Sequence, residues 1–592
     1  MNLRHAVAFL LGAGCLHAGD AKWIRLDAQN FSIISDGPED EIRSWAVEFD
    51  QFHHGLERVL KINEAGLQPV TVVLFRSQRE LRPYKPLEKG KPAMVDGMFM
   101  RTPLGNFIEC ADDSEDEQTR RVIFHEAVHW MTNTSDTELP VWLNEGLAEV
   151  FSTFSVDNDL YNYGRAIDGH VILLNRDGMM PLKQLMGIQR NSLLYNEGER
   201  TSIFYAESWA FVHYLLFSGQ LEERTKYNQL IRSLRVHADP DAVFIQIFGV
   251  DCAAMDKRLA HYLRNGAYTI NRIRFDRSAV NKSFRVGPAS RADVNLAECN
   301  LLSATDRPSE ALRRLREVVR QMPDNPASWE SEGYAAYQTE DYGEAESSFR
   351  QAATLGSRDY FVYSFLGDAA LGIYPGRITA SAGGDPRQAA DYYEHELVLN
   401  PHEQHAYVNM AENAFGMDEL TDTDVKVLQE GARFFPDDMG IKLGIAVVDL
   451  KRGRAEAGQT ELEAIAADMS PANKDVSKYA RTILYNRSLI EGFNKLQDLW
   501  QAHEYEKAIA LANELLKQDQ TPANRDSLMR TRDNAKVAMK VQQGVDLANS
   551  GEMPEAKKVL AEALSEAGDQ QMRDQIQGLI DRMASASERR SQ

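Results

Sequence analysis

The chain has 592 residues, of which 43% are hydrophobic and 26% charged, a composition typical of an ordinary soluble globular protein. Its length predicts about three or four domains. Its formal net charge of −22 argues against a nucleic-acid-binding protein, because such proteins need a basic surface. The cysteines Cys110, Cys252 and Cys299 are scattered, so they predict neither a disulfide framework nor a CxxC metal site.

Residues 1–21 have the pattern of a secretory signal peptide. Arg4 precedes an apolar run over residues 6–14, and a small residue follows at Ala21. This run is too short for a transmembrane helix, which needs about 20 apolar residues. A buried N-terminal helix or strand, or lipidation of Cys15, are the alternatives. Because export without a disulfide framework fits a bacterial periplasm, we expect a periplasmic protein, with an outer-membrane lipoprotein or a secreted protein as alternatives.

Residues 22–114 are predicted to form the α/β part of the first domain, including an edge strand. Apolar and β-branched residues at 31–35 (FSIIS) and 69–75 (PVTVVLF) predict two strands. Between them, the amphipathic stretch 39–62 predicts a helix. The stretch 97–110 predicts two further strands joined by a turn.

Residues 115–280 are predicted to be mostly helical, because apolar residues recur there at three- and four-residue spacing. In the first helix, His125 and His129 are four residues apart, so both imidazoles lie on one helix face and can bind one metal ion. Glu126 lies between them, where its carboxylate can reach a water on that metal. The spacing therefore predicts a candidate metal site with a neighbouring base.

A second helix supplies the residues that would complete this site. Glu145 follows His129 after a turn and would complete the His₂Glu set of catalytic zinc sites, which leaves a fourth position for water. Glu149 shares the helix face of Glu145 and is placed to accept the free N–H of one histidine, and Asn144 is placed to orient the other. The alternative is a pair of amphipathic helices whose polar residues have ordinary partners.

Residues 291–592 carry the pattern of a helical repeat array, interrupted by a long loop near 372–386. Small residues at fixed positions let paired helices approach closely, and larger residues fill the space between them. An unrelated bundle would imitate one such repeat but not a series. The characteristic tetratricopeptide positions of two repeats are occupied by Trp329, Gly333, Ala345, Phe349 and Ala352, and then by Tyr363 and Gly367.

The motifs HEAVHW and WLNEGLAEVF resemble those of the gluzincin metallopeptidases, and especially of the peptidase-MA-like family, whose bacterial members are often joined to tetratricopeptide repeats. The resemblance covers residues 22–275. It implies a thermolysin-like fold, in which a small sheet with an edge strand over the cleft is followed by the helix pair that carries the ligands. The implied roles are Zn²⁺ ligation by His125, His129 and Glu145, and general base catalysis by Glu126.

Aminopeptidases related to this family have a tyrosine that opens a helix with the pattern YEKGxxxxxYL. Here the stretch YAESWAFVHYL begins at Tyr205, which follows Glu145 by 205 − 145 = 60 residues. The lysine and glycine of the family pattern are absent. The resemblance implies that the Tyr205 hydroxyl stabilises the oxyanion, and the alternative is an aromatic packing residue. His213, in the same helix, is predicted to be structural.

The predicted architecture is an α+β zincin-like (thermolysin-like) peptidase domain followed by an all-α tetratricopeptide-repeat solenoid. The predicted function is an exported zinc metallopeptidase whose repeats recruit a peptide or protein substrate, or a protein partner. Endopeptidase action is expected, since residues 97–110 lack the GxMEN motif that holds a free amine in aminopeptidases. Two alternatives remain open: a catalytically silent zincin-fold scaffold that binds proteins through its repeats, and repeats that only dock onto the first domain and stabilise it.

Overall fold

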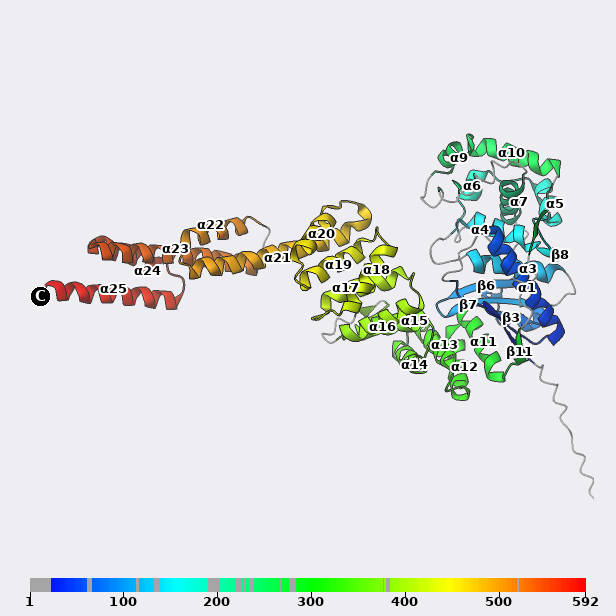
Figure 1. Ribbon diagram of the computed structural model, residues 1–592, viewed down its shortest axis with the longest axis horizontal. Coiled ribbons are helices and arrows are strands. Elements are labelled where there is room, and N and C mark those ends of the chain that lie inside the picture. The colour runs from blue at the N-terminus through cyan, green and yellow to red at the C-terminus, as the bar shows by residue number, and fades with distance from the viewer. Residues whose placement is uncertain are drawn as a thin grey trace, which may run out of the picture. The chain divides into compact units, whose positions relative to one another are not determined.

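The computed structural model consists mostly of helices (Figure 1). Two compact units are present, Met1–Asn409 and Met410–Gln592. The predicted signal peptide and Cys15 lie outside the described residues. The structure describes residues 23–60, 67–112, 117–132, 139–189, 203–218, 226, 229–230, 233, 239–266, 268–275, 284–375, 377–378, 384–518 and 521–591.

A six-stranded sheet forms the centre of the first unit. The neighbouring strands β2, β3 and β7 run parallel, whereas β11, β1 and β6 pair antiparallel with their neighbours. The strands predicted at 31–35, 69–75 and 97–110 are confirmed, and the first two strands of the order below, β11 and β1, were not predicted. The strand order is β11 (Arg285–Pro288), β1 (Ile24–Asp27), β2 (Phe31–Ser35), β3 (Val70–Phe75), β7 (Gly105–Ala111) and β6 (Gly97–Thr102).

The upper face of this sheet, in the view of Figure 1, packs on helices α1 (Glu39–Leu60) and α3 (Glu117–Thr132). Side chains of a strand alternate between the two faces of the sheet, and Ile33, Val72 and Ile108 belong to the core on this side. The predicted helix at 39–62 is confirmed as α1. Short elements join β3 to β6, namely α2 (Gln78–Leu81), β4 (Leu87–Glu88) and β5 (Lys91–Pro92).

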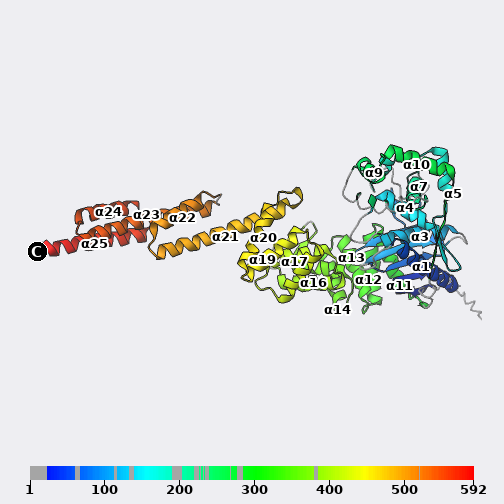
Figure 2. The ribbon, with the colours of Figure 1, turned by 45° about the horizontal axis from the view of Figure 1, so that its top comes forward.

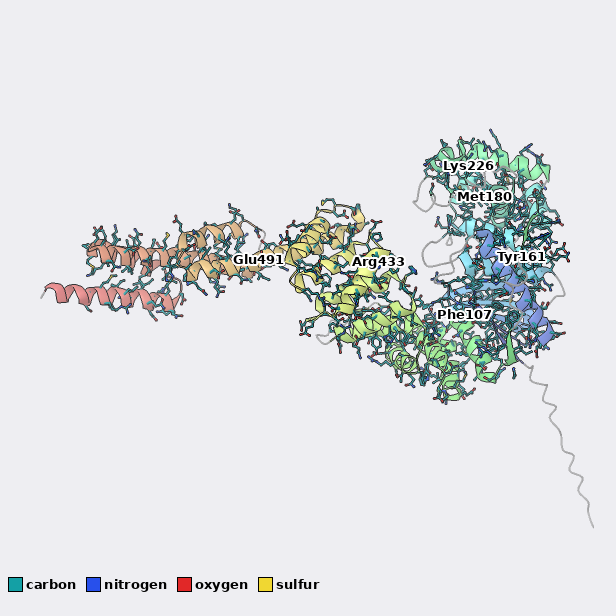
Figure 3. All side chains as sticks on the ribbon, viewed as in Figure 1. Phe107, Tyr161, Met180, Lys226, Arg433 and Glu491 are labelled. Carbon is teal, nitrogen blue, oxygen red and sulfur yellow. The ribbon has the colours of Figure 1, made fainter. Side chains whose placement is uncertain are left out.

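The opposite face of the sheet packs on the first helices of the repeat region. One core contains Ile34, Val73 and Phe107 of the sheet together with Leu301 and Leu315 of the first repeat helices. Figure 3 labels Phe107 at this position. Figures 1 and 2 show α3 and α4 on one side of the sheet and α11 and α12 on the other. The α/β domain and the first repeats therefore fold around a common core, which agrees with the docking alternative for these repeats.

A helical layer follows α3, as predicted for residues 115–280. Inside it lies a small antiparallel sheet, in the order β10 (Asn271–Arg274), β9 (Leu160–Tyr163) and β8 (Ser155–Asp157), which the sequence interpretation missed. The most buried helix of the layer is α7, whose residues Glu207–His213 are all fully buried. The helices are α4 (Val141–Ser152), α5 (Asp168–Asp177), α6 (Leu182–Met186), α7 (Ile203–Phe217), α9 (Pro240–Phe248) and α10 (Cys252–Asn265).

The first helix of the predicted repeat region, α11, begins at Arg291. The pairing of the repeat helices follows the predicted positions: a Cβ added to Gly333 would come within 2.7 Å of the Phe349 ring, and one added to Gly367 within 2.3 Å of the Tyr393 ring. Glycine is therefore required there for close helix contact. In the first unit these helices are α11 (Arg291–Ala304), α12 (Pro308–Gln321), α13 (Pro326–Gln338), α14 (Tyr342–Thr354), α15 (Tyr360–Ala370) and α16 (Pro386–Leu399).

The predicted long loop between α15 and α16 contains two short paired strands, β12 (Ile373–Tyr374) and β13 (Arg377–Ile378). Helix α17 (Gln404–Gly416) contains the division between the two units.

In the second unit, α21 and α23 have 28 and 29 residues, and the sequence interpretation did not foresee helices of this length. Among the described residues, no helix combines the length and apolarity needed to cross a membrane. The elements of this unit are α18 (Asp422–Phe434), α19 (Met439–Lys451), α20 (Ala455–Ala467), the 3-10 helix η1 (Pro471–Asn473), α21 (Lys474–Gln501), α22 (Tyr505–Leu516), α23 (Pro522–Ser550), α24 (Met553–Glu566) and α25 (Gln570–Ser591).

Candidate metal centre

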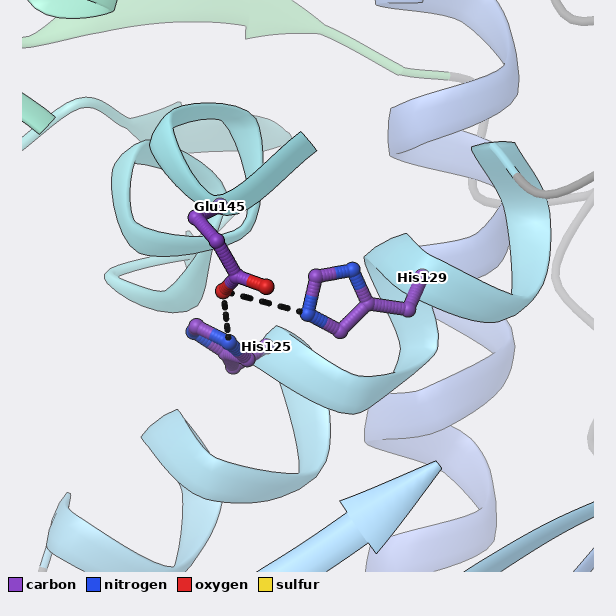
Figure 4. Close-up of side chains that lie close together, drawn as sticks. All are labelled: His125, His129 and Glu145. Atoms are coloured by element: carbon purple, nitrogen blue, oxygen red, sulfur yellow. Dashed lines mark ion pairs between the residues drawn. The ribbon is translucent and has the colours of Figure 1, made fainter. Parts of the chain in front are cut away.

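Helices α3 and α4 bring the three predicted ligands together (Figure 4). The Nε2 atoms of His125 and His129 lie 3.3 Å and 3.5 Å from the same oxygen, Oε2 of Glu145. One possible ligand atom from each residue lies within 4.8 Å of the others. His125 and Glu145 are buried, and the His129 side chain is 12% exposed. Two imidazole nitrogens and one carboxylate oxygen are the donor set of catalytic zinc sites, so these residues fit Zn²⁺.

The charge state of Glu145 suits a metal ligand. Burial by itself raises the pKa of Glu145, but the charge of His129 and hydrogen bonds from both histidines outweigh burial and leave this pKa well below its ordinary value. The carboxylate is therefore ionised at neutral pH, and metal ligands must be deprotonated to bind.

Glu149 lies on the far side of His125 from Glu145. Its Oε1 lies 3.4 Å from His125 Nδ1, and its Oε2 lies 3.1 Å from His170 Nε2. If Nε2 of His125 binds the metal, its Nδ1–H donates to Glu149 and the ring orientation is fixed. His170 comes from α5, and sequence reasoning missed it because no local spacing links it to the motif.

Asn144 does not make the contact that was expected of it. Its Oδ1 lies 3.0 Å from Thr132 Oγ1, so it ties α4 to the end of α3. Nδ1 of His129 is buried and has no hydrogen-bond partner among the described residues. The reason is helical geometry: Asn144 precedes the ligand Glu145 by one residue and so lies about 100° around the helix from it.

Glu126 is held at the edge of the sheet. The backbone N–H of Phe99, in edge strand β6, donates to Glu126 Oε2 at 2.8 Å. Because β6 pairs with β7 on one side only, its outer N–H groups face away from the sheet. The predicted base and the predicted edge strand are thus in direct contact next to the ligand cluster.

Helix α7, whose first turn contains Tyr205, packs against the ligand helix α4. Tyr205 is 2% exposed, and its ring packs edge-on against Phe204, 5.3 Å between centroids. One turn later, Ser208 lies against Gly146, the residue after Glu145: a Cβ on Gly146 would come within 2.5 Å of the Ser208 backbone oxygen. This close approach requires glycine in α4. The role of the Tyr205 hydroxyl at an oxyanion stays a prediction.

His213 has a structural environment, in agreement with its prediction. Its Nε2 and Nδ1 lie 2.7 Å from Gly164 O and from Tyr262 Oη, respectively. Because a carbonyl oxygen only accepts, Nε2 donates to Gly164 and Nδ1 accepts from Tyr262. Burial lowers the pKa of His213 to about 4, which agrees with a neutral ring.

Comparison with known protein families matches residues 296–360 to the tetratricopeptide repeat family. The chain contains tetratricopeptide repeats. Such repeats generally bind protein partners. No curated protein matches this chain.

Solved structures similar to the chain include other repeat proteins. A tetratricopeptide repeat protein from Parabacteroides merdae is 14% identical, with 50% of this chain and 98% of that chain covered and a TM-score of 0.21. The MamA RS-1 ArsTM double mutant is 16% identical, with 30% and 92% covered and a TM-score of 0.23. The human IFIT1 dimer with PPP-AAAA is 15% identical, with 70% and 96% covered and a TM-score of 0.23. The assignment of repeats rests on the family match and on the helix pairing rather than on these structures.

Proposed function

We propose that this protein is a zinc metallopeptidase. The observation that carries the proposal is the convergence of His125, His129 and Glu145, with the Glu126 carboxylate beside them. When bound, Zn²⁺ supplies Lewis-acid activation of water and of the scissile carbonyl. The gluzincin resemblance of the two motifs supports the same assignment.

Residues of the chain transfer the proton, orient the ligands and stabilise the oxyanion. Glu126 takes the proton of the attacking water and delivers it to the leaving amine. Glu149 holds the His125 ring in the orientation that ligation needs, and His170 holds Glu149 from the other side. Tyr205 is proposed to donate its hydroxyl to the developing oxyanion.

Endopeptidase action is the proposed form of this activity. An extended peptide is able to pair with the outer backbone groups of β6, as in β-strand addition, and the contact of Phe99 with Glu126 places such a peptide beside the base. No free amine is needed for this mode. We expect N-terminally blocked peptides to be cleaved as well as free ones. A strict requirement for a free N-terminus, in a comparison of the two by mass spectrometry, would assign an aminopeptidase instead.

Replacing a single ligand is expected to remove the metal. In a His129→Ala protein, zinc content after dialysis should fall from one ion per chain to nearly none, because a three-ligand site cannot lose one ligand and keep its affinity. Elemental analysis measures this. His54→Ala, which removes a half-exposed histidine of α1, is the matched control and should keep its zinc. Full zinc retention by the His129→Ala protein would remove the basis of the proposal.

Tyr205→Phe is expected to lower kcat by about two to three powers of ten, the usual cost of one oxyanion donor. The ring is buried, and phenylalanine keeps its packing, so fold and zinc content should be unchanged. Tyr214→Phe, on the same helix, is the control for removing a hydroxyl from α7. An unchanged kcat in the Tyr205→Phe protein would make this tyrosine a packing residue.

A second candidate function is a catalytically silent scaffold that binds peptides or proteins through its repeats. The tetratricopeptide match at 296–360 favours it, because such repeats generally bind protein partners. Cleavage that depends on Glu126 favours the peptidase. Zinc binding without any such cleavage, together with a specific partner recovered from the native organism, favours the scaffold.

The proposed location is the bacterial periplasm, on the basis of the signal-peptide pattern in residues 1–21. N-terminal sequencing of the mature protein tests this: a start after residue 21 supports a secretory signal, and a lipidated Cys15 supports an outer-membrane lipoprotein.

A further inference from the structure

A cavity of about 880 Å³ lies beside the candidate metal centre. Its walls are the first half of α3, the end of α4 and the segment 165–176, which includes the start of α5. His125 is part of this wall as well as a predicted ligand. The cavity therefore adjoins the candidate centre through His125, on the side where Glu149 lies, and a peptide bound at the metal would have to pass this ring to reach it.

Arg121 brings a cation with unused hydrogen-bonding capacity into the wall. It lies one turn before His125 on α3, and its side chain is 26% exposed. Arg121 forms an ion pair of 3.6 Å with Glu149, which is too long for a hydrogen bond. Its Nε is buried and has no hydrogen-bond partner among those residues. Leaving a buried charged donor without an acceptor is costly, and a ligand carboxylate would remove that cost.

The start of α5 adds further donors to the same wall. Ile167, the N-cap residue, provides no side-chain hydrogen bond, and the first N–H groups of a helix have no acceptor within it. The next two residues, Asp168 and Gly169, both line the cavity. The amino end of a helix carries partial positive charge, which favours an anion.

The acidic residues of the wall do not cancel this preference. Glu117 pairs with Arg165, and Glu149 is engaged by His125 and His170. Asp168 is exposed, so water and salt screen its charge. Arg176, the remaining cation of the wall, pairs with Asp177. Among the three arginines of the wall, Arg121 is therefore the one whose ion pair is too long for a hydrogen bond.

We propose that this cavity is a substrate subsite that binds a carboxylate on Arg121. The carboxylate comes either from an acidic side chain near the scissile bond or from the C-terminus of a short peptide. Val122 and Leu173, which are also in the wall, provide apolar surface for the stem of that residue. The proposal rests on the proposed peptidase function, and it names the class of substrate.

The test is equilibrium binding to the full-length, zinc-loaded Glu126→Gln protein, in which cleavage is blocked. Three fluorescent N-acetylated peptides share one alanine-rich sequence: one has a central Glu and an amidated C-terminus, one a central Gln and an amidated C-terminus, and one a central Gln and a free C-terminus. We expect one of the two carboxylate peptides to bind about ten times more tightly than the neutral peptide, because charge-assisted hydrogen bonds are the strong ones. The peptide that is preferred identifies the source of the carboxylate.

Substitution of Arg121 tests whether this residue is responsible. In a Glu126→Gln, Arg121→Met protein the ratio of affinities should fall close to one, since methionine keeps the apolar stem but not the charge. Arg120→Met in the same background is the matched control: Arg120 neighbours Arg121 on α3 but pairs with Glu48. That protein should keep the ratio. Equal affinities for all three peptides, or a ratio that survives Arg121→Met, would overturn the subsite.

The binding experiments test the subsite, and cleavage by the wild-type protein tests the peptidase proposal, so that each proposal can fail without the other. Selective binding by a protein whose wild type cleaves no peptide would leave the subsite standing and reject the peptidase. Cleavage that depends on Glu126, combined with unselective binding, would reject the subsite and leave the peptidase standing.

Discussion

Glu126→Gln is expected to lower kcat by about two to four powers of ten, the usual contribution of a positioned general base. A glutamine amide does not accept the proton of the attacking water. Its side-chain oxygen still accepts the hydrogen bond from the Phe99 N–H, which holds this position in the structure. The fold and the zinc content should therefore be unchanged. The measurement is steady-state cleavage of a blocked peptide, together with elemental analysis of the same sample.

Glu145→Gln is the informative companion to this variant. The same chemical change at a predicted ligand should lower zinc content, because a neutral amide is a poorer ligand than the ionised carboxylate. Zinc retention in the Glu126→Gln protein would support Glu126 as the base, and zinc loss from the Glu145→Gln protein would support Glu145 as a ligand. Loss of zinc from the Glu126→Gln protein would mean that the two roles are misassigned, and unchanged turnover would mean that Glu126 is not the base.

The parts of the site that could be predicted from the sequence are those that lie on one or two helix turns. His125, His129 and Glu145 were placed by spacing alone, and the structure brings them together. Glu149 was placed in the same way, by its four-residue spacing from Glu145. Local periodicity is sufficient for such residues because a helix repeats its face every three to four residues.

The contributions that were missed come from elsewhere in the chain. His170 reaches Glu149 from α5, 21 residues away in sequence, and no motif marks it. Phe99 contributes a backbone N–H, for which any residue except proline would serve. Asn144 was expected to reach His129 but contacts Thr132, because adjacent residues of a helix point in different directions.

In the fold, too, local patterns could be predicted and contacts between distant segments could not. The β-branched segments that became β2 and β3 were visible in the sequence, and so was the hairpin of β6 and β7. β1 pairs with β11, where Ile24 lies opposite Pro288, and four-residue strands that meet across such a separation leave no local signature. The shared core of the sheet and the first repeats was hidden for a similar reason. The apolar residues of the sheet and those of the repeat helices each have the usual pattern of a buried face, and only the structure shows that the two faces pack against each other.

A chain that ends near residue 281 is expected to be insoluble or unfolded. It lacks β11, which pairs with β1, and the repeat helices that cover the lower face of the sheet. A solvent-exposed apolar face and an unpaired strand edge both favour aggregation. Five large side chains of that face are 6% exposed or less in the full chain, namely Ile34, Val73, Phe75, Met100 and Phe107.

The loss of stability can be calculated from the five apolar side chains that become exposed to water. At about 2 kcal/mol for each fully buried side chain of this size, exposing the five removes about 10 kcal/mol. The whole stability of a typical domain is only about 5–15 kcal/mol. Soluble yield and circular dichroism measure the outcome. The control is a chain that ends at residue 418, after α17, which keeps β11 and α11–α16 and should remain folded and bind zinc.

The outcome decides what the first repeats do. If the short chain fails and the control succeeds, the helices α11–α16 are structural support for the α/β domain, and recruitment of a substrate or a partner is expected of the repeats after them. A soluble 1–281 chain that binds zinc and cleaves short peptides would show that the sheet does not need this cover. In that case the apolar residues of the common core of the sheet and the first repeats would form a docking surface rather than part of one folding unit, and the first repeats would be free to act in recruitment.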